Sequence, residues 1–389
     1  IDGMVNRNLW LSTLIMVPTV DSIQEMRVLT SNYSAEYGIA AGAVTIVQTR
    51  SGTNKIRASA YEFLRNSALD ANQFFNNRLG VAKPAFRRNE FGGTLGGPVY
   101  LPSFGLNGRK LYDGHNRTFF FISREGTELR QGLTKTFTVP TVAMRNGDFS
   151  GITDTSFRAI TIYDPRTTRS VQVGNRQIAQ RDPFPGNKIP SSLQSPLSKA
   201  VWGFTPLPTD ITDPVFASNL KVAVHTNGLP NLSDNPTTVK IDHRIGTNDN
   251  FFLKVNGGNR HTNFMGTGST TGAPTNGGEA NVTYLPMDAI TAAFSWTHVF
   301  SPSFFVETNI SRTWQATQTI TGSEQQDWAK KLGLPNPLGD IGFPNITNVQ
   351  FMNYIEGDNR RGLHSRLLNV QQNYSWIRGT HNIQFGGGA

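Results

Sequence analysis

The chain has 389 residues and is low in both hydrophobic residues, at 37%, and charged residues, at 16%. Its 25 Phe, 9 Tyr and 6 Trp, together with 38 Gly and 21 Pro, favour many β-strands joined by long loops over a helical bundle. Cysteine is absent, which excludes disulfides, zinc–thiolate sites and a cysteine nucleophile. The net charge of +9 is scattered, with no basic run denser than pairs such as Arg87-Arg88, so we expect solvated loops and no nucleic-acid partner.

The N-terminal region offers no membrane-spanning helix. Its most apolar stretch, Leu9–Val20, is about a dozen residues long, whereas a spanning helix needs roughly 20. The sequence begins with Ile1 and has no basic region before this stretch, so we expect no signal peptide. Both ends of the sequence suggest a piece of a longer protein.

The first 55 residues predict a small α+β unit. Ile23–Leu29 and Gly42–Thr49 have the composition of strands. Ser34–Gly38 has the serine cap and the glycine stop of a single helical turn.

From about Ile56 onward the hydrophobic pattern changes to period two, which predicts strands. In Ala289–Phe300 one face is apolar and aromatic, and the other is small and mostly polar. Phe304–Trp314 follows after the short link Ser301–Ser303, which predicts a hairpin. The complete set of nine expected strands is Arg57–Arg65, Asn89–Val99, Thr118–Thr127, Thr238–Ile245, Asn250–Gly257, Ala289–Phe300, Phe304–Trp314, Leu367–Ile377 and His381–Gly387.

The expected connections are short at one end of the strands and long at the other. The links Gly246–Asp249, Ser301–Ser303 and Arg378–Thr380 are tight. The long ones are Glu128–Pro236, Asn259–Leu285 and Ala316–Ser365, and the many prolines of the first predict an irregular segment. The link Val99–Arg117 is longer than a tight turn, which leaves the register of the third strand open.

This pattern predicts an all-β, mainly antiparallel fold. Strands of about ten residues with an apolar outer face and a polar inner face are what a transmembrane β-barrel requires. A soluble β-sandwich also has alternating strands and stays open as an alternative.

Several motifs, in a fixed order, resemble one family. Val20–Asn54 is similar to the end of the plug domain of TonB-dependent outer-membrane transporters. The later motifs Ser59–Asn66, Arg87–Pro98, Thr118–Phe121 and Val139–Phe149 resemble the Oar-like branch, whose members carry a carboxypeptidase-regulatory-like domain.

The resemblance implies a partial barrel of about nine of 22 strands, with residues 1–55 as the C-terminal part of the plug and residues 56–389 as the N-terminal part of the barrel. The long loops, including about 128–236, would be extracellular and the tight turns periplasmic. The implied function is solute import across the bacterial outer membrane, driven by a TonB-like energy transducer that engages a segment upstream of this sequence. Implied partners are also outer-membrane lipid, lipopolysaccharide and a siderophore, cobalamin, glycan or peptide solute. Export or adhesion by such a barrel, and a soluble glycan-binding β-protein, are the alternatives.

The residues give no indication of an enzyme, a metal site or a cofactor. The seven histidines never pair at ligand spacing beside a carboxylate, and Gly92–Gly97 is better explained as strand glycines packed close to the plug than as a phosphate loop. Side chains expected to face the lumen and to contact solute or plug are Glu62, Arg124, Lys240, Asp242, Lys254, Glu307 and Asn309.

Overall fold

The structure is a computed structural model that describes residues 1–7, 14–30, 42–78, 82–102, 110–154, 156–209, 220–224, 230–265, 282–321, 327–339, 341–342, 344 and 361–389. The expected helical turn Ser34–Gly38 lies outside these ranges.

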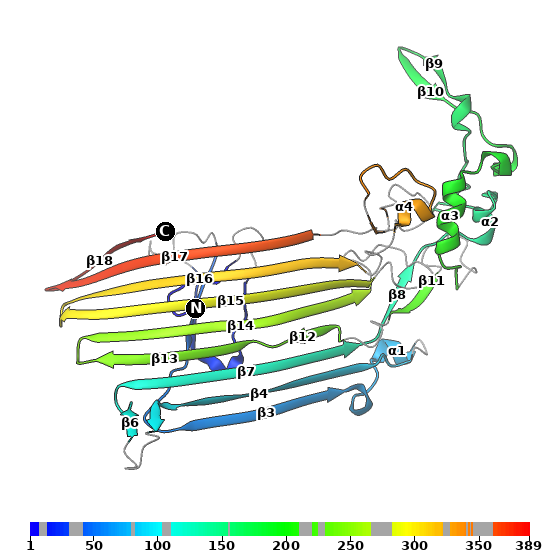
Figure 1. Cartoon of the computed structure of the whole chain (residues 1–389). Helices are drawn as coiled ribbons and strands as arrows, with labels where there is room; N and C mark the ends of the chain where they lie inside the picture. Colours follow the sequence, from blue (N-terminus) through cyan, green and yellow to red (C-terminus); the bar gives the residue numbers. More distant parts are fainter. Residues whose placement is uncertain are drawn as a thin grey trace.

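One large antiparallel sheet dominates the described chain (Figure 1). Its strands are β3 (Arg57–Asn66), β4 (Phe86–Pro98), β7 (Thr118–Gln131), β12 (Leu232–Asp234), β13 (Thr237–Ile245), β14 (Asp249–Met265), β15 (Val282–Ser301), β16 (Phe304–Thr321), β17 (Arg361–Arg378) and β18 (His381–Gly388). Strands β12 and β13 share one position, because both pair with β7 on one side and with β14 on the other. The sheet therefore has nine positions in chain order, and the predicted nine antiparallel neighbours are confirmed.

The three predicted tight turns lie at one end of the sheet. They join β13 to β14, β15 to β16 and β17 to β18, and the register pairs Ile245 with Asp249 and Arg378 with His381. Gly246 and Gly379 adopt φ values of 60° and 59° in two of these turns, a conformation that glycine reaches without strain. Strand β7 pairs with β4 from Phe119 onward without a register shift, so the third strand is settled.

The strands are longer than predicted at the end opposite the tight turns. Strand β14 continues to Met265 and β15 begins at Val282, so the expected loop boundaries at Asn259 and Leu285 are wrong. Likewise β16 continues to Thr321 and β17 begins at Arg361. Hydrophobic alternation appears only in the part of a strand that faces lipid. The backbone hydrogen bonds between strands continue beyond that part, where both faces are polar, and the strands are therefore longer than the alternation predicts.

The two faces of the sheet differ in polarity. We call the face that contacts residues 1–30 the inner face and the opposite one the outer face. One outer row runs across four strands through Leu253, Phe294, Ile310 and Val370. The inner row next to it holds Lys254, Ala293, Ser311 and Asn369. This is the alternation that the sequence predicted.

Aromatic side chains form a belt on the outer face near the tight turns. Phe251 stacks on Trp296 with ring centroids 6.3 Å apart, and Tyr374 stacks on Phe385 at 5.0 Å. Between them, contacts run through His298, Phe300 and Phe304. The Asp249 carboxylate accepts hydrogen bonds from the Trp296 indole, at 2.8 Å, and from His298. Amphipathic rings of this kind suit a membrane interface.

The N-terminal segment lies against the inner face (Figure 1). It contains a 3₁₀ turn at Val20–Ser22 and the antiparallel pair β1 (Ile23–Leu29) and β2 (Val44–Thr49), which forms its own two-stranded sheet. Both strands were predicted.

The connections carry small elements of their own. They comprise β5 (Tyr100–Pro102) paired with β6 (Lys110–Asp113), β8 (Leu133–Phe137) with β11 (Leu220–Val224), β9 (Arg169–Val173) with β10 (Arg176–Gln180), the helices α1 (Phe74–Arg78), α2 (Val142–Arg145), α3 (Pro196–Phe204) and α4 (Trp328–Lys331), and 3₁₀ turns at Ser67–Leu69, Pro165–Thr167, Pro185–Asn187 and Ser191–Leu193.

The prediction that Glu128–Pro236 is irregular is therefore wrong in part. Pro165, Pro185 and Pro196 each stand at the first positions of a helix or helical turn. Proline is favoured there because it has no N–H to leave unpaired and its φ is already helical.

We predict that the outer face tolerates charge much less than the inner face. Val370→Lys, on the outer face of β17, should lower the free energy of unfolding by about 2–4 kcal/mol, the cost of a cation near the bilayer midplane. Gln371→Lys, the adjacent inner-face residue, is the matched control and should cost less than about 1 kcal/mol. Urea unfolding in lipid vesicles, followed by tryptophan fluorescence, measures both. Equal losses would contradict the assignment of the faces.

Candidate functional site

A buried ion pair joins the N-terminal segment to the inner face. The Lys254 ammonium of β14 contacts the Asp2 carboxylate, and the two side chains are only 2% and 5% exposed. Asp2 also accepts hydrogen bonds from the backbone N–H and the hydroxyl of Thr49, both at 2.7 Å. One carboxylate thus ties together the start of the chain, β2 and the sheet.

The environment of Asp2 favours its charged form. Burial alone would raise the pKa of this carboxyl, but the positive charges of Lys254 and Lys240, with the hydrogen bonds from Lys254 and Thr49, hold the pKa below its ordinary value. The carboxylate is therefore ionised at neutral pH, as the ion pair requires.

A second polar contact lies beside the first, on β13. The Lys240 ammonium is 3.7 Å from Asp242, and the Ser51 hydroxyl donates to the same carboxylate oxygen at 3.2 Å. Lys240 also lies over the ring of Phe252, 4.7 Å from its centroid. The segment that follows β2 is thus held to the sheet by a hydrogen bond to a charged group.

Further contacts are polar or depend on small residues. The Thr19 hydroxyl donates to that of Ser123 on β7 at 3.3 Å, and both side chains are buried. On β16, Asn309 donates to Glu307 at 2.8 Å. Gly3, with φ of 78°, packs on this pair: a Cβ there would lie 2.9 Å from the Asn309 amide nitrogen. Only glycine fits both the space and the conformation.

Glycines also line the point where the chain passes into the sheet. A Cβ on Gly52 would lie 2.3 Å from the carbonyl oxygen of Phe120 and 2.7 Å from that of Gly97. A Cβ on Gly96 would lie 3.6 Å from the Cα of Gly52. The prediction that the glycines of Gly92–Gly97 belong to a strand is confirmed, and the predicted close packing on the N-terminal segment is seen at Gly96, whereas Gly92 and Gly93 pack on other strands of the sheet.

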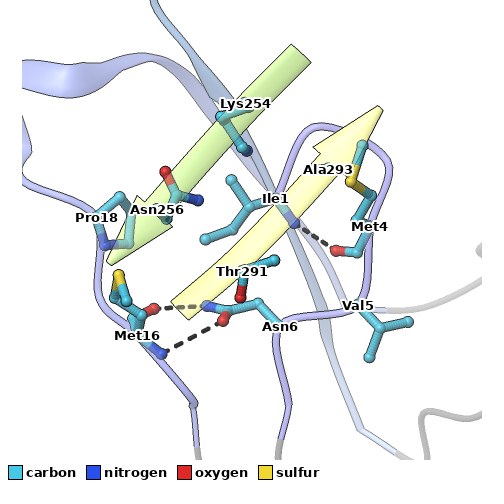
Figure 2. Close-up of a pocket in the computed structure, with 10 residues that line it drawn as sticks. All are labelled: Ile1, Met4, Val5, Asn6, Met16, Pro18, Lys254, Asn256, Thr291 and Ala293. Atoms are coloured by element: carbon cyan, nitrogen blue, oxygen red, sulfur yellow. Dashed lines mark hydrogen bonds between the residues drawn. The ribbon is translucent and has the colours of Figure 1, made fainter. Parts of the chain in front are cut away.

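A small cavity lies inside this interface (Figure 2). Asn6 holds Met16 through two hydrogen bonds, and Lys254 and Asn256 of β14 face them across the cavity. The volume is about 20 Å³, which admits one water molecule and no solute. The cavity belongs to the packing of the interface and is no binding site for a transported molecule.

The large loops form a second organised region, beyond the end of the sheet opposite the tight turns (Figure 1). The Arg145 guanidinium donates to four carbonyl oxygens, of which those of Trp202, Thr205 and Pro206 lie at the end of α3. Phe204 meets Trp328 of α4 edge to face, with ring centroids 4.9 Å apart. The loop between β7 and β12 therefore packs against the loop between β16 and β17.

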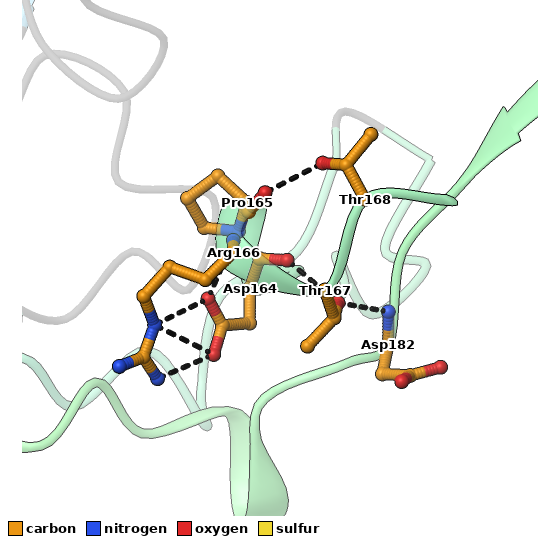
Figure 3. Close-up of polar contacts among 6 residues, drawn as sticks. All are labelled: Asp164, Pro165, Arg166, Thr167, Thr168 and Asp182. Atoms are coloured by element: carbon orange, nitrogen blue, oxygen red, sulfur yellow. Dashed lines mark hydrogen bonds and ion pairs between the residues drawn. The ribbon is translucent and has the colours of Figure 1, made fainter. Parts of the chain in front are cut away.

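Hydrogen bonds, several of them to charged side chains, hold the turns next to the β9–β10 hairpin in this loop region. Asp164 caps a 3₁₀ turn by accepting from the Arg166 N–H and guanidinium, and the Thr167 hydroxyl accepts from the Asp182 N–H at 2.8 Å (Figure 3). These contacts clamp the base of the β9–β10 hairpin. Nearby, Lys188 and Ser150 hold the pKa of Asp148 at about 2.

The structure sorts the seven predicted lumen-facing residues into two groups. Lys240, Asp242, Lys254, Glu307 and Asn309 lie on the inner face at the contact with the N-terminal segment. Glu62 and Arg124 lie on the outer face, so their predicted orientation is wrong.

The pairing gives the reason for this correction. The Tyr61 hydroxyl donates to Glu125 across Gly92 on the inner face, so the adjacent residue Glu62 points outward. Ser123 contacts Thr19 on the inner face, so Arg124 points outward too. Asp2 and Thr19 were missed as partners because short polar residues in irregular chain carry no periodic signal, and Thr49 was missed because the alternation of β2 does not show which group its end contacts.

Comparison with known proteins identifies the family. Residues 48–389 match the family model described as "Outer membrane beta barrel domain". The chain belongs to this family. It is thus a β-barrel protein of the bacterial outer membrane.

Solved structures with a similar arrangement are outer-membrane proteins of Escherichia coli. The transporter YddB is 8% identical, with a TM-score of 0.45, and the match covers 95% of this chain and 35% of that one. The ferric-catecholate import receptor Fiu in its open form is 9% identical, with a TM-score of 0.33, over 95% of this chain and 60% of that one. The chain therefore spans about a third of the length of YddB. No curated protein sequence matches significantly.

The described residues include neither a membrane-spanning helix nor a cluster of metal ligands. None of the helices among them is long and apolar enough to cross a membrane. Within the same ranges, no three His, Asp or Glu side chains gather as ligands for a metal ion.

We predict that Lys254 controls the release of the N-terminal segment. Lys254→Met leaves the Asp2 carboxylate buried without its cation, a loss worth about 3–5 kcal/mol for a buried pair. In a Thr19→Cys background, where the thiol is otherwise buried and is the sole cysteine, labelling by a thiol reagent should accelerate at least about tenfold. Lys55→Met, at an exposed lysine, is the control and should leave the rate unchanged. Unchanged labelling in Lys254→Met would refute the role of the pair.

A second prediction concerns pH. Because the pKa of Asp2 is lower in the folded protein than in the unfolded chain, its contribution is present at neutral pH and is lost as the pH falls through that lowered value. Labelling of Thr19→Cys with a dipyridyl disulfide, which reacts in acid, should therefore accelerate below about pH 4. Asp2→Asn should label fast at every pH and show no acid step. An acid step of equal size in Asp2→Asn would assign it to another group.

Proposed function

We propose that this protein is a TonB-dependent receptor that binds a solute at the cell surface and admits it to the periplasm. Residues 1–55 act as the C-terminal part of a plug and residues 56–389 as the N-terminal part of the barrel. An energy transducer of the inner membrane supplies the work by pulling on the plug. The tight turns face the periplasm and the large loops face outward.

The observation that carries this proposal is the character of the contact between the N-terminal segment and the inner face. It combines the Lys254–Asp2 pair, hydrogen bonds at Asp242 and Ser123 and close glycine contacts with buried apolar side chains such as Met4 and Ile15. Polar groups released from such a contact are solvated by water, whereas an apolar core would resist separation. A plug that must detach reversibly needs this kind of interface.

The free energy needed to separate the N-terminal segment from the sheet can be supplied by an external force. Breaking one buried ion pair costs several kcal/mol, so spontaneous opening is rare but a mechanical pull makes it feasible. The importer therefore stays closed until the transducer acts. No chemical step within this chain is needed.

Further strands complete the barrel in this proposal. Among the described residues β3 and β18 form the two edges of the sheet and do not pair with one another. In hydrocarbon each unpaired backbone group costs several kcal/mol, so both edges require partners. The 22-stranded barrel that the resemblance implies supplies them. The order of motifs such as Arg87–Pro98 supports the Oar-like branch.

The inner-face residues have a narrower role here than the sequence suggested. Lys240, Asp242, Lys254, Glu307 and Asn309 hold the plug, and solute selection falls to the loop region built around Arg145 and Trp328. Siderophore, cobalamin, glycan and peptide are all compatible with it. The soluble glycan-binding alternative is excluded by membership of the outer-membrane family.

Adhesion or export by the same barrel is the rival. The organised loop region favours binding at the cell surface whether the protein is an importer or an adhesin or exporter. The rival differs in one respect: the plug would not have to move.

A disulfide between plug and barrel separates the two readings. The hydroxyls of Thr19 and Ser123 lie 3.3 Å apart, and residues 1–389 contain no cysteine that could compete. We predict that Thr19→Cys with Ser123→Cys cross-links on oxidation and abolishes uptake, while surface binding persists. Uptake is measured with a panel of labelled ferric siderophores, cobalamin, oligosaccharides and peptides, in cells with and without the receptor.

The controls isolate the movement of the plug. Each single cysteine variant should transport normally, and a reductant should restore uptake in the double variant. Deletion of the energy transducer should abolish uptake in all of them. Undiminished uptake through the cross-linked protein, or no receptor-dependent uptake of any solute in the panel, would refute import.

A further inference from the structure

The β9–β10 hairpin has no role in the interface described above. Figure 1 shows it projecting from the loop region, away from the large sheet. Among the described strands, β9 and β10 pair only with each other, in a continuous register without a bulge. A two-stranded hairpin in water is marginally stable, and a third strand would stabilise it. In the described structure both edges of the hairpin are open to such a strand.

The hairpin is held in shape at both of its ends. At the base, the Arg169 guanidinium lies 2.9 Å from the Asp182 carboxylate, beside the hydrogen bond between the Asp182 N–H and the Thr167 hydroxyl. At the tip, Gly174 adopts a φ of 60° at the first position of a two-residue turn, an arrangement that hairpins favour. The edges are therefore formed before a partner binds.

The residues of the hairpin do not protect its edges against pairing. Proteins commonly block an exposed edge with lysine, proline or a bulge. Residues 169–180 contain neither lysine nor proline. Val173 and Ile178 lie on the same face of the hairpin and are 56% and 47% exposed. An open edge beside exposed β-branched residues is a template for another strand.

The register shows which backbone groups point away from the hairpin. Val173 and Arg176 flank the two-residue turn and form a hydrogen-bonded pair, and hydrogen-bonded and non-hydrogen-bonded pairs alternate from there. Ala179 therefore directs its N–H and C=O away from β9, and its partner Ser170 directs its own groups away from β10. Outward groups at this spacing match another extended backbone.

Charge indicates which edge is used and what it binds. Residues 164–182 carry four arginines and two aspartates, and both aspartates form ion pairs at the base of the hairpin. Arg176 of β10 is exposed, and the described residues offer it no carboxylate. A strand added to β10 would meet Arg176 and Ile178 on one face. Opposite charges and apolar pairs across neighbouring strands stabilise a sheet, so the matching strand is acidic and partly apolar.

We propose that the β10 edge binds an extended, acidic segment of a partner protein as a third strand. A carboxylate of that segment pairs with Arg176, and an apolar side chain covers Ile178. A second copy of this chain is disfavoured because it would bring further unpaired arginines to the same edge. The partner docks on the loop region and is not the transported solute, so the proposal does not depend on import.

The test measures binding of labelled ten-residue peptides to the purified intact protein in detergent, by fluorescence anisotropy. The probe peptide alternates valine with threonine and carries two glutamates, and the comparison peptide has two lysines in their place. The glutamate peptide should bind at least about tenfold more tightly. Arg176→Glu should reverse this preference.

Two proline variants distinguish the edges. Ala179→Pro removes an outward N–H from β10 and should raise the dissociation constant of the glutamate peptide about tenfold. Ser170→Pro, at the paired position on β9, is the matched control and should bind within about twofold of wild type. Neither proline removes a hydrogen bond between β9 and β10, because both replaced N–H groups point outward.

A further arm uses only the wild-type protein. The glutamate peptide methylated at alternate backbone nitrogens keeps its charge but cannot donate to the edge, so it should bind at least about tenfold more weakly. No binding of the glutamate peptide, equal binding of the lysine or the methylated peptide, unchanged affinity in Ala179→Pro, or an equal loss in Ser170→Pro would each overturn the proposal. A dimer of the intact protein that Ala179→Pro separates in sedimentation would also overturn it, because the edge would then belong to a second copy.

Discussion

Hydrocarbon offers no hydrogen-bond partner to the peptide backbone, and the rest of this structure depends on that constraint. A strand in lipid must pair its N–H and C=O groups with a neighbour on each side. Among the described strands the seven interior positions of the sheet do so in chain order, and the edge strands β3 and β18 do so on one side. Connections between neighbours in chain order can be short at one end, as at Gly246 and Gly379. The large loops then gather at the other end, where they contact each other.

The same constraint divides the two faces. Lipid covers the outer face, so Leu253, Phe294 and Ile310 lie in one apolar row. On the inner face the polar row is covered by the N-terminal segment, which buries Lys254 almost completely. A buried ammonium is tolerated only with a partner, and Asp2 provides it from the far end of the chain. The polar inner face of the sheet and the polar groups of the N-terminal segment that covers it therefore require each other.

The sequence carried most of the fold and part of the site. Period-two alternation predicted nine strands and the faces of Lys240, Lys254 and Asn309, because apolar residues on one side of each strand are what lipid demands. The alternation failed to indicate the faces of two strands. In β3 the neighbours Phe63 and Leu64 are both apolar, and in β7 the neighbours Phe121 and Ile122 are both apolar. Phe121 is buried beside Gly96 and Gly52 on the inner face, whereas Phe63 is exposed there, and the alternation no longer shows which face is outer.

What the sequence could not supply are contacts between distant segments. Lys254 was recognised as an inner residue, but its partner Asp2 lies 252 residues away in irregular chain. Likewise, only the register of β4 and β7 places Arg87 opposite Arg130, a neighbour that the sequence does not indicate.

The contacts within the loop region could not be predicted from the sequence either. Its buried residues, among them Val139, Met144 and Val201, follow no repeat, since they lie in short helices and turns such as α2, which is capped by the Thr141 side chain. Arg145 binds the carbonyl groups at the end of α3, where backbone acceptors have no partner within the helix. Phe204 and Trp328 then join two loops that start from different hairpins. Because these contacts lie among the loops, the loop region has a small core of its own, and its surface can vary without disturbing the strands. In the proposed receptor, recognition of the solute by the loops and retention of the N-terminal segment by the inner face therefore rest on separate sets of residues.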